Sequence, residues 1–329
     1  MPSNPIQFHR TTYVKDLVFV DGLGRSGKFL LAPLVASLER VEQFRMSWLL
    51  EYIPIYLAVG QMSFNVALDI FKTEIELLFY ENAIGRNINA READLTSFCS
   101  FRDPEIYRKR FRSTEEGDLA VKTFLATNPI MAFLTHDIMC HSQISFEAFP
   151  SLKIIHIKRH PITMVDSWCR RRTEPLLTNV RLSTPTILGE HKILPWDTYN
   201  WIEEAENLSY TDLLIKIISQ KLKQVKKSFE TSSQEKRKQI MLVYFEELVT
   251  KPQKVLKEIC EFLGTTETDY TSLLLKKEGC PRRLARKDKC AALERIKAVA
   301  STEATDSLLA LSDEYENEFQ CNLDSPLPY

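Results

Sequence analysis

The sequence predicts an α/β protein in which a parallel sheet is flanked by helices on both faces, with helical insertions. Three apolar segments have the composition of buried strands, at 18–20, 153–158 and 240–244. Each is followed by a segment whose apolar residues have helical spacing, and this alternation favours a parallel sheet covered on both sides. At 329 residues and 44% hydrophobic content, the chain can bury a large core. We expect a single domain over residues 1–329.

The first third of the chain is predicted to be mainly helical after its first strand. Apolar residues from 29 to 42 follow one helical stripe that Pro33 kinks. The aromatic and apolar tract 46–79 predicts two or three helices, with breaks near Pro54 and Gly60. We expect the region of about 43–118 to form the helical, acceptor-side wall of a pocket.

The middle of the chain contains one further predicted strand, the 153–158 strand named above and a loop-rich segment. Residues 119–124 are expected to form a short buried strand, followed by an apolar helix near 130–134. The strand at 153–158 leads into a helix over about 162–172. Three prolines and a glycine make 173–200 loop-rich, which is typical of a lid.

The last third returns to helices around one strand. A charged amphipathic helix is expected over 201–229, and the strand 240–244 leads into a helix that Gly264 ends. We expect a helical C-terminal tail over about 271–329, with a basic loop at its start.

A glycine-spaced turn follows the first predicted strand. Its residues are Gly22, Leu23, Gly24, Arg25, Ser26, Gly27 and Lys28. Between a strand and a helix, such glycines let backbone N–H groups and the positive helix end approach an anion. The spacing matches G-x-x-x-x-G-K, but Phe29 stands where a nucleoside-triphosphatase has Ser or Thr to hold magnesium. We expect a P-loop-type fold that binds a phosphate-like group without metal; an ordinary glycine-rich turn is the alternative.

The composition excludes some classes of partner. A net charge of −1 gives no general attraction to nucleic acid or to an anionic membrane. Seven scattered cysteines without a C-x-x-C pair indicate free thiols in a reducing compartment. No run has the length or apolar character of a signal peptide or membrane span, so we expect a cytoplasmic protein or one whose anchor has been removed. The oligomeric state cannot be predicted.

A second anion site is expected at the end of the 153–158 strand. Ligands in a parallel sheet lie beyond the carboxyl ends of the strands, so Arg159 should meet the glycine-spaced turn. If Pro161 begins a helix, Thr163 and Ser167 lie on one face of it. Arg159 and Ser167 could then hold one phosphate group. A surface arginine at a strand end is the alternative for Arg159.

Three motifs in this order resemble those of the sulfotransferases that use 3′-phosphoadenosine 5′-phosphosulfate (PAPS). The turn at 22–27 is similar to the family's 5′-phosphosulfate loop, and the Arg-x-Pro with a later Ser at 159–167 is similar to its 3′-phosphate motif. Residues 244–264 resemble its strand and helix of the Tyr-Glu-Asp-Leu to Phe-Leu-Gly type. The three motifs together span most of the chain.

The resemblance implies a role for each matching residue. The residues implied to bind the donor are Gly22, Gly24, Arg25, Ser26, Gly27, Lys28, Arg159 and Ser167. Arg25 would support the departing phosphate. The family usually has Thr or Ser at the position of Lys28, so Lys28 either replaces Arg25 in its role or indicates another ligand. The family closes the 3′-phosphate site with a basic C-terminal loop, for which Arg286 or Lys287 are candidates; a solvated charge run is the alternative.

The general base is the hardest residue to find in the sequence. Some branches of the family have a His in a Lys-Thr-His-Leu-Pro strand end, but this chain has Phe124 in the corresponding Lys-Thr-Phe-Leu. Glu51 is our candidate, because burial among aromatic residues would raise its pKa. The other candidates are Glu39, Glu42, His136 and His141.

The sequence therefore predicts an enzyme that moves a sulfuryl group from PAPS to a hydroxyl of a small-molecule or carbohydrate acceptor, with Arg25, Lys28 and Glu51 as catalytic residues and no metal. Two alternatives remain. One is a P-loop kinase that uses ATP and magnesium, which the Gly-Lys pair favours. The other is a non-catalytic nucleotide-binding protein of the same fold.

Overall fold

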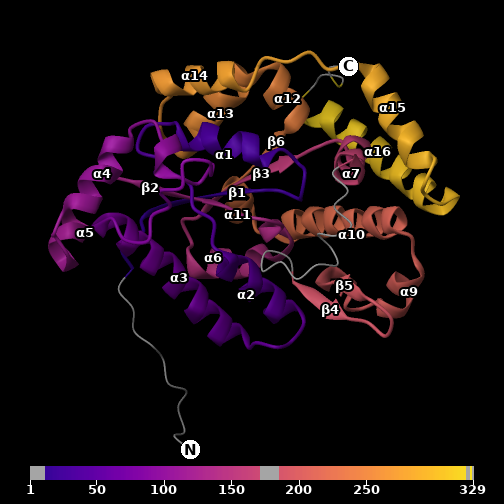
Figure 1. Cartoon of the computed structure of the whole chain (residues 1–329), viewed down its shortest axis with the longest axis horizontal. Helices are drawn as coiled ribbons and strands as arrows, with labels where there is room; N and C mark the ends of the chain where they lie inside the picture. The colour runs from indigo at the N-terminus through magenta and orange to yellow at the C-terminus, as the bar shows by residue number, and fades with distance from the viewer. Residues whose placement is uncertain (1–11, 171–184, 324–326, 328–329) are drawn as a thin grey trace, which may run out of the picture.

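The computed structural model describes residues 12–170, 185–323 and 327. Its central sheet has four parallel strands in the order β2-β1-β3-β6 (Figure 1). The strands are β1 (Asp16–Asp21), β2 (Ile130–Leu134), β3 (Lys153–Lys158) and β6 (Ile240–Tyr244). The predicted α/β class with a parallel sheet is confirmed, and all three strands assigned as clear from the sequence are present.

Alternate side chains of β1 enter two different cores. Leu17 and Phe19 belong to one buried cluster, while Val18 and Val20 belong to another, as expected for a strand covered on both faces. The second cluster includes residues of α1 (Lys28–Ala36), α13 (Pro252–Leu263) and α14 (Asp269–Lys277). In Figure 1 these helices lie above the sheet.

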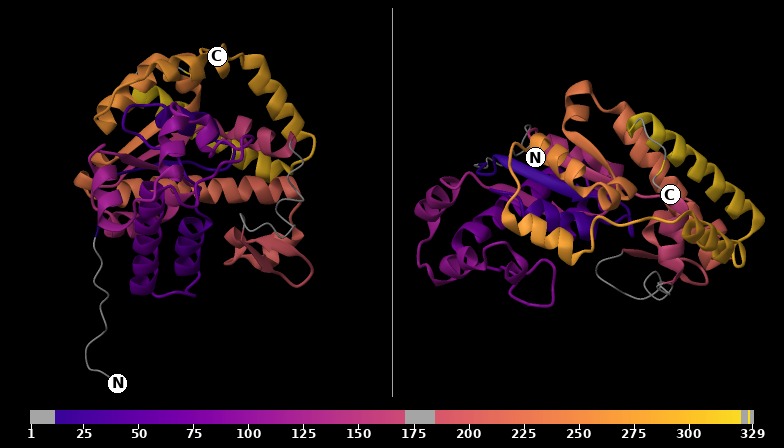
Figure 2. Two further views of the ribbon diagram at one scale, coloured as in Figure 1. Left: turned by 60° about the vertical axis from the view of Figure 1, so that its left-hand side comes forward. Right: turned by 90° about the horizontal axis from the view of Figure 1, so that it is seen from above.

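The opposite face is covered by the helices of the first cluster. They include α3 (Phe64–Ile84), α5 (Gly117–Leu125), α6 (Ser142–Ala148), α7 (Pro161–Arg170) and α10 (Tyr210–Thr231). The helix α2 (Trp48–Ala58) packs beside α3. A small antiparallel hairpin, β4 (Thr186–Leu188) and β5 (Ile193–Pro195), lies with α9 (Ile202–Asn207) on the same side of α10 as the α2–α3 pair in both figures (Figures 1 and 2).

The remaining elements surround this framework. They are α4 (Pro104–Arg112), α11 (Gln234–Lys238), α12 (Phe245–Thr250), α15 (Arg286–Lys297), α16 (Thr302–Leu323) and the short 3-10 helices η1 (Phe98–Ser100), η2 (Ile138–His141) and η3 (Trp196–Thr198). Helices α15 and α16 both pack on α7. None of the helices in the described ranges combines the length and hydropathy that crossing a bilayer requires.

The strand predicted over 119–124 and the helix predicted near 130–134 are both wrong, because the first is a helix and the second a strand. Residues 119–124 lie in helix α5, and residues 130–134 form strand β2. In α5 the buried side chains are Ala120, Val121 and Phe124, which is a helical face. All five residues of β2 are buried, so no alternation distinguished this strand from a buried helix.

Smaller differences concern where helices begin and end. The stripe predicted over 29–42 is helical only from Lys28 to Ala36, and the chain then runs beside β2, where Val41 and Arg45 make isolated bridges. Pro54 lies inside α2 and does not break it. The helix predicted over 201–229 is divided into α9 and α10. Of the predicted lid over 173–200, residues 173–184 lie outside the described residues.

Candidate active site

The glycine-spaced turn joins β1 to α1 with a tightly folded backbone. Arg25 has φ 68°, in the left-handed region that non-glycine residues seldom adopt, and Gly27 has φ 105°. A side chain at Gly24 could not be accommodated, because its Cβ would lie 2.2 Å from the Trp168 ring. The Trp168 indole N–H donates to the Gly24 carbonyl at 3.0 Å. The loop is therefore packed directly against α7.

The predicted meeting of the loop with the end of β3 is present. The Nε of Arg25 donates to Ser167 Oγ at 2.9 Å, and Arg159 donates to the Arg25 carbonyl at 3.0 Å. Arg159 also donates to Thr163 Oγ1 at 3.2 Å, and its guanidinium lies 4.4 Å from the centre of the Phe245 ring. Two arginines and a buried serine thus converge at the carboxyl ends of β1 and β3.

Lys28 lies beneath the loop rather than at its surface. Its side chain is 1% exposed, and Nζ donates to the carbonyls of Gly22 and Leu23 at 2.6 and 3.2 Å. Burial lowers the pKa of Lys28 to about 8, although the nearby carboxylates of Asp137, Asp21 and Glu51 oppose this shift. The amine therefore holds the loop together as well as adding positive charge beneath it.

The loop also has the features of an anion site. Within the described residues, the buried Ser26 hydroxyl has no hydrogen-bond partner. A buried polar group without a partner is costly, and an anionic oxygen at the loop would satisfy it. The first turn of α1 begins at Lys28 and directs its positive end to the same place.

Asp21, at the end of β1, holds the chain segment that follows β2. Its carboxylate accepts hydrogen bonds from Thr135 Oγ1 and from the backbone of Ile138 and Met139, and lies 2.8 Å from His156 Nδ1. Burial alone would raise the pKa of Asp21, but these hydrogen bonds and the charges of His156 and Lys28 hold it well below its usual range. This ionised carboxylate sets the position of the chain that follows β2.

The chain that leaves β2 brings His136 to Glu51. The Glu51 carboxylate accepts from the backbone N–H of His136 at 2.8 Å, and the same oxygen lies 3.2 Å from His136 Nδ1. Burial raises the pKa of Glu51, and the hydrogen bond to His136 offsets part of this rise. The imidazole lies between the rings of Phe29 and Trp48, with centroids 6.1 and 6.4 Å away.

His136 is a functional candidate that the sequence placed only as an alternative. The wrong strand prediction over 119–124 places Phe124 at the position of the family's strand-end His. Residues Leu134-Thr135-His136 end the true strand, so Thr-His stands where the resemblance expects it. Assigning β2 correctly would have revealed this signal.

The other candidates for the base are placed elsewhere. Glu42 is buried in a two-point ion pair with Arg110, at 2.7 and 3.0 Å, and accepts from Tyr107. Glu39 is exposed. Burial together with the charge of Lys221 lowers the pKa of His141 to about 4. This side chain lines the cavity described in the next paragraph.

A cavity of about 420 Å³ connects these groups. Its lining includes Arg25, Lys28, Arg159, Glu51 and His136. Aromatic and aliphatic side chains form much of its wall: Phe29, Trp48, Ile55, Trp168, Trp196, Leu214, Ile217 and Ile218. The cavity thus combines cationic side chains of the loop and of the β3 end with apolar and aromatic side chains, beside the pair of Glu51 and His136.

The C-terminal candidates Arg286 and Lys287 are not in this lining. Both are exposed in the first turn of α15, so the predicted basic loop is partly helical. Lys289, in the same helix, and the buried His160 contact the same carboxylate, Glu316, at 2.5 and 3.0 Å. Helix α16 is thereby attached to the start of α7.

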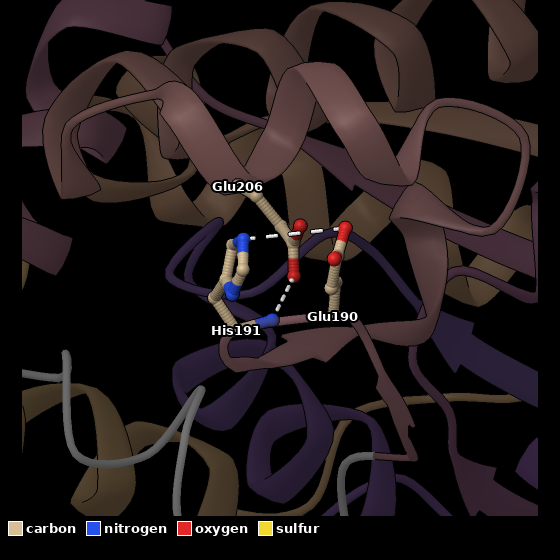
Figure 3. A group of neighbouring side chains, drawn as sticks. All are labelled: Glu190, His191 and Glu206. Carbon is tan, nitrogen blue, oxygen red and sulfur yellow. Dashed lines mark hydrogen bonds and ion pairs between the residues drawn. The ribbon is translucent and has the colours of Figure 1, made fainter.

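One group of side chains within the described ranges has the spacing of metal ligands. Glu190, His191 and Glu206 bring ligand atoms within 4.8 Å of one another on the surface (Figure 3). The Glu206 carboxylate already accepts from the backbone N–H groups of His191 and Lys192, at 2.8 and 3.4 Å. The cluster therefore ties α9 to the turn between β4 and β5 and does not by itself indicate a metal centre.

Part of the chain matches a known family. Residues 120–278 match the family model described as a sulfotransferase domain, so over this stretch the chain is similar to the sulfotransferase family. The matched stretch contains His136, the 159–167 motif and residues 244–264, whereas the glycine-spaced loop precedes it. A comparison with curated proteins finds no match.

Several solved sulfotransferases are similar in structure. STF9 from Mycobacterium avium is 15% identical over 94% of this chain and 78% of its own, with a TM-score of 0.48. The sulfotransferase domain of the Synechococcus PCC 7002 olefin synthase is 15% identical, covering 95% of this chain and 98% of that domain, with a TM-score of 0.46. The sulfotransferase domain from the curacin biosynthetic pathway is 14% identical over 78% and 77%, with a TM-score of 0.44.

Proposed function

We propose that this protein moves a sulfuryl group from PAPS to a hydroxyl of a small-molecule or carbohydrate acceptor. The observation that supports the proposal most is the convergence of Arg25, Ser167 and Arg159 next to the glycine-spaced loop. The loop and the arginine–serine group offer two neighbouring anion sites. A donor with both a 5′-phosphosulfate and a 3′-phosphate matches this pair.

On the donor side, each residue has a separate task. Ser26, Gly27 and Lys28 bind the 5′-phosphosulfate through a hydroxyl, backbone N–H groups and charge. Arg159 and Ser167 bind the 3′-phosphate, because the planar guanidinium suits charge-assisted, two-point contact with phosphate oxygens. Arg25 stands between the two sites and stabilises the charge that develops on the leaving phosphate.

On the acceptor side, we assign His136 as the general base and Glu51 as the residue that positions it. When Nδ1–H donates to Glu51, Nε2 is the nitrogen left to accept the proton of the acceptor hydroxyl. This assignment replaces Glu51 as the base itself, because its carboxylate already receives the hydrogen bonds of His136. The apolar wall excludes water and holds the acceptor for in-line attack.

No step in this proposal needs a metal. The positive charges of Arg25, Lys28 and Arg159 occupy the end of the cavity where a phosphoryl-transfer enzyme would use magnesium. Phe29, which is 47% exposed, replaces the hydroxyl residue that would hold that ion.

The test is a transfer assay with PAPS and a panel of phenols, alcohols and saccharides, with products detected by mass. We expect a sulfated product and release of adenosine 3′,5′-bisphosphate. Changing Arg25 to Ala should reduce turnover far more than it reduces affinity for that nucleotide. Unchanged turnover in Arg25→Ala would refute its role. Transfer from ATP that requires magnesium, with none from PAPS, would favour the kinase alternative.

A further inference from the structure

A second, larger cavity adjoins the active-site pocket. It encloses about 890 Å³ between α10, α6 and the facing parts of α2 and α3. Pro54 and His141 line both cavities, so the two are neighbours that share these residues in their walls. We call this second cavity the lysine groove. A ligand long enough to pass His141 from the side of His136 would reach it.

Most of the charged residues that line the lysine groove are lysines. Lys223 and Lys227 lie one helical turn apart on α10, and Lys236 lies on α11. The acidic residue of the lining is Glu147, which pairs with Lys236 at 3.4 Å. Among the described side chains, no carboxylate pairs with Lys223 or Lys227. In a chain of net charge −1 this is a local concentration of positive charge, which attracts an anionic ligand.

The rest of the groove suits a ligand rich in hydroxyl groups. Gln143 and Gln224 bring side-chain amides to it, and Ser142 and Ser228 hydroxyls lie 2.9 Å apart in its wall. At the junction of the two cavities the His141 and Trp196 rings have centroids 6.0 Å apart. Such rings can pack against the C–H face of a sugar while the amides and hydroxyls bind its oxygens.

We propose that the lysine groove binds the acidic part of an oligosaccharide acceptor, with Lys223 and Lys227 contacting its carboxylates while one sugar hydroxyl reaches His136. This inference rests on the proposed function for the identity of the reacting site. It adds the acceptor class: an acidic saccharide of several units. A small neutral alcohol would leave the groove empty, and an acidic peptide is the rival occupant.

The experiment measures binding to the full chain by fluorescence anisotropy, with a labelled hyaluronan hexasaccharide as the probe. We expect it to bind at least about tenfold more tightly than the same hexasaccharide with its carboxylates reduced to alcohols, and the difference should shrink as salt is added. The double variant Lys223→Glu, Lys227→Glu should lose at least about tenfold in affinity for the acidic probe.

The matched control is Lys226→Glu. Lys226 is exposed on the same helix but pairs with Glu314 at 3.7 Å and is not in the lining of the groove, so its variant should bind the probe as the unchanged protein does. Equal affinity for the acidic and reduced probes overturns the proposal, as does an equal loss in Lys226→Glu. Tighter binding of a polyglutamate peptide than of the hexasaccharide would favour the rival.

A separate measurement distinguishes this proposal from the proposed function. Affinity for adenosine 3′,5′-bisphosphate should be the same in the unchanged protein and in the double variant, because the lysine groove lies outside the donor site. If that nucleotide fails to bind at all, the proposed donor is wrong. Loss of hexasaccharide binding with normal nucleotide binding in the double variant supports the groove.

Discussion

The proposed donor side and the proposed acceptor side of the pocket are built in different ways. On the donor side, two contiguous motifs supply the residues, one after β1 and one after β3. Arg25 of the first motif contacts Ser167 and Arg159 of the second. On the acceptor side, His136 meets a carboxylate from α2 that lies 85 residues away in the chain. A site built from contiguous motifs keeps a sequence signature, whereas one built from distant single residues does not. We therefore expect substitutions on the acceptor side to lower turnover and substitutions on the donor side to lower affinity for the nucleotide.

Replacing His136 is expected to have the largest effect. His136→Ala should lower kcat by about 10²–10⁴-fold, because the proton acceptor is lost, while affinity for adenosine 3′,5′-bisphosphate stays the same. Steady-state kinetics and calorimetry measure the two quantities. His191→Ala, an exposed histidine of the hairpin turn, is the control and should leave both unchanged. A His136→Ala enzyme with normal kcat would contradict the assignment of the base.

The donor side is tested by Arg159. Arg159→Ala should weaken binding of adenosine 3′,5′-bisphosphate by about ten- to a hundredfold, because charge-assisted hydrogen bonds to phosphate are lost. Arg159→Lys keeps the charge but not the planar guanidinium, so its affinity for the nucleotide should lie between that of the unchanged protein and that of Arg159→Ala. Arg170→Ala, which removes an exposed partner of Asp166 on the same helix, serves as the control. If Arg159→Ala binds normally, the 3′-phosphate site lies elsewhere.

Glu51→Gln should separate activity from stability. The variant is expected to lose roughly tenfold or more in kcat, because an amide orients the imidazole less strongly than a carboxylate does. It should also melt roughly 1–3 °C higher at neutral pH. Since burial raises the pKa of Glu51, ionising it costs the folded state stability as pH rises above the usual range of a glutamate, and the amide removes that cost.

The melting difference should also depend on pH. Below the usual pKa range of glutamate, both the folded and the unfolded chain carry a neutral Glu51, so the gain of Glu51→Gln should disappear there. Thermal melts of both proteins across acidic and neutral pH measure it. A gain that grows toward acidic pH, or a lower melting temperature at neutral pH, would show that Glu51 is stabilised as an anion.

Removing divalent metal is expected to have the smallest effect. A chelator should change the rate of sulfuryl transfer by less than about twofold, because arginine and lysine side chains stabilise the developing charge in this proposal. The assay is repeated with added magnesium as the control. A loss of activity that magnesium restores would indicate that the donor side uses a metal in spite of Phe29.

The sequence predicted the geometry around the glycine-spaced loop better than the geometry around His136, for a physical reason. The loop at 22–28 and the Arg-x-Pro at 159 carry their geometry in local backbone preferences: glycines, a proline at the first turn of a helix, and a strand before each. Their meeting followed from the parallel sheet. The pair of His136 and Glu51 depends on the placement of α2 over the end of β2, which no local pattern encodes.

The exchanged strand and helix show the same limit. Residues 130–134 are buried on both faces, so periodicity could not distinguish strand from helix, and the error concealed the Thr-His that follows. The burial of Lys28 also could not be predicted from the sequence. Its amine donates to the carbonyls of Gly22 and Leu23, which come within reach only once the loop has folded.

The most direct test of the central claim is a crystal structure of the protein with adenosine 3′,5′-bisphosphate bound. We expect the 3′-phosphate within hydrogen-bonding distance of Arg159 and Ser167, and the 5′-phosphate on the loop at Ser26 to Lys28 with Arg25 between them. A nucleotide bound away from the loop, or with its two phosphates in the reverse order, would contradict it.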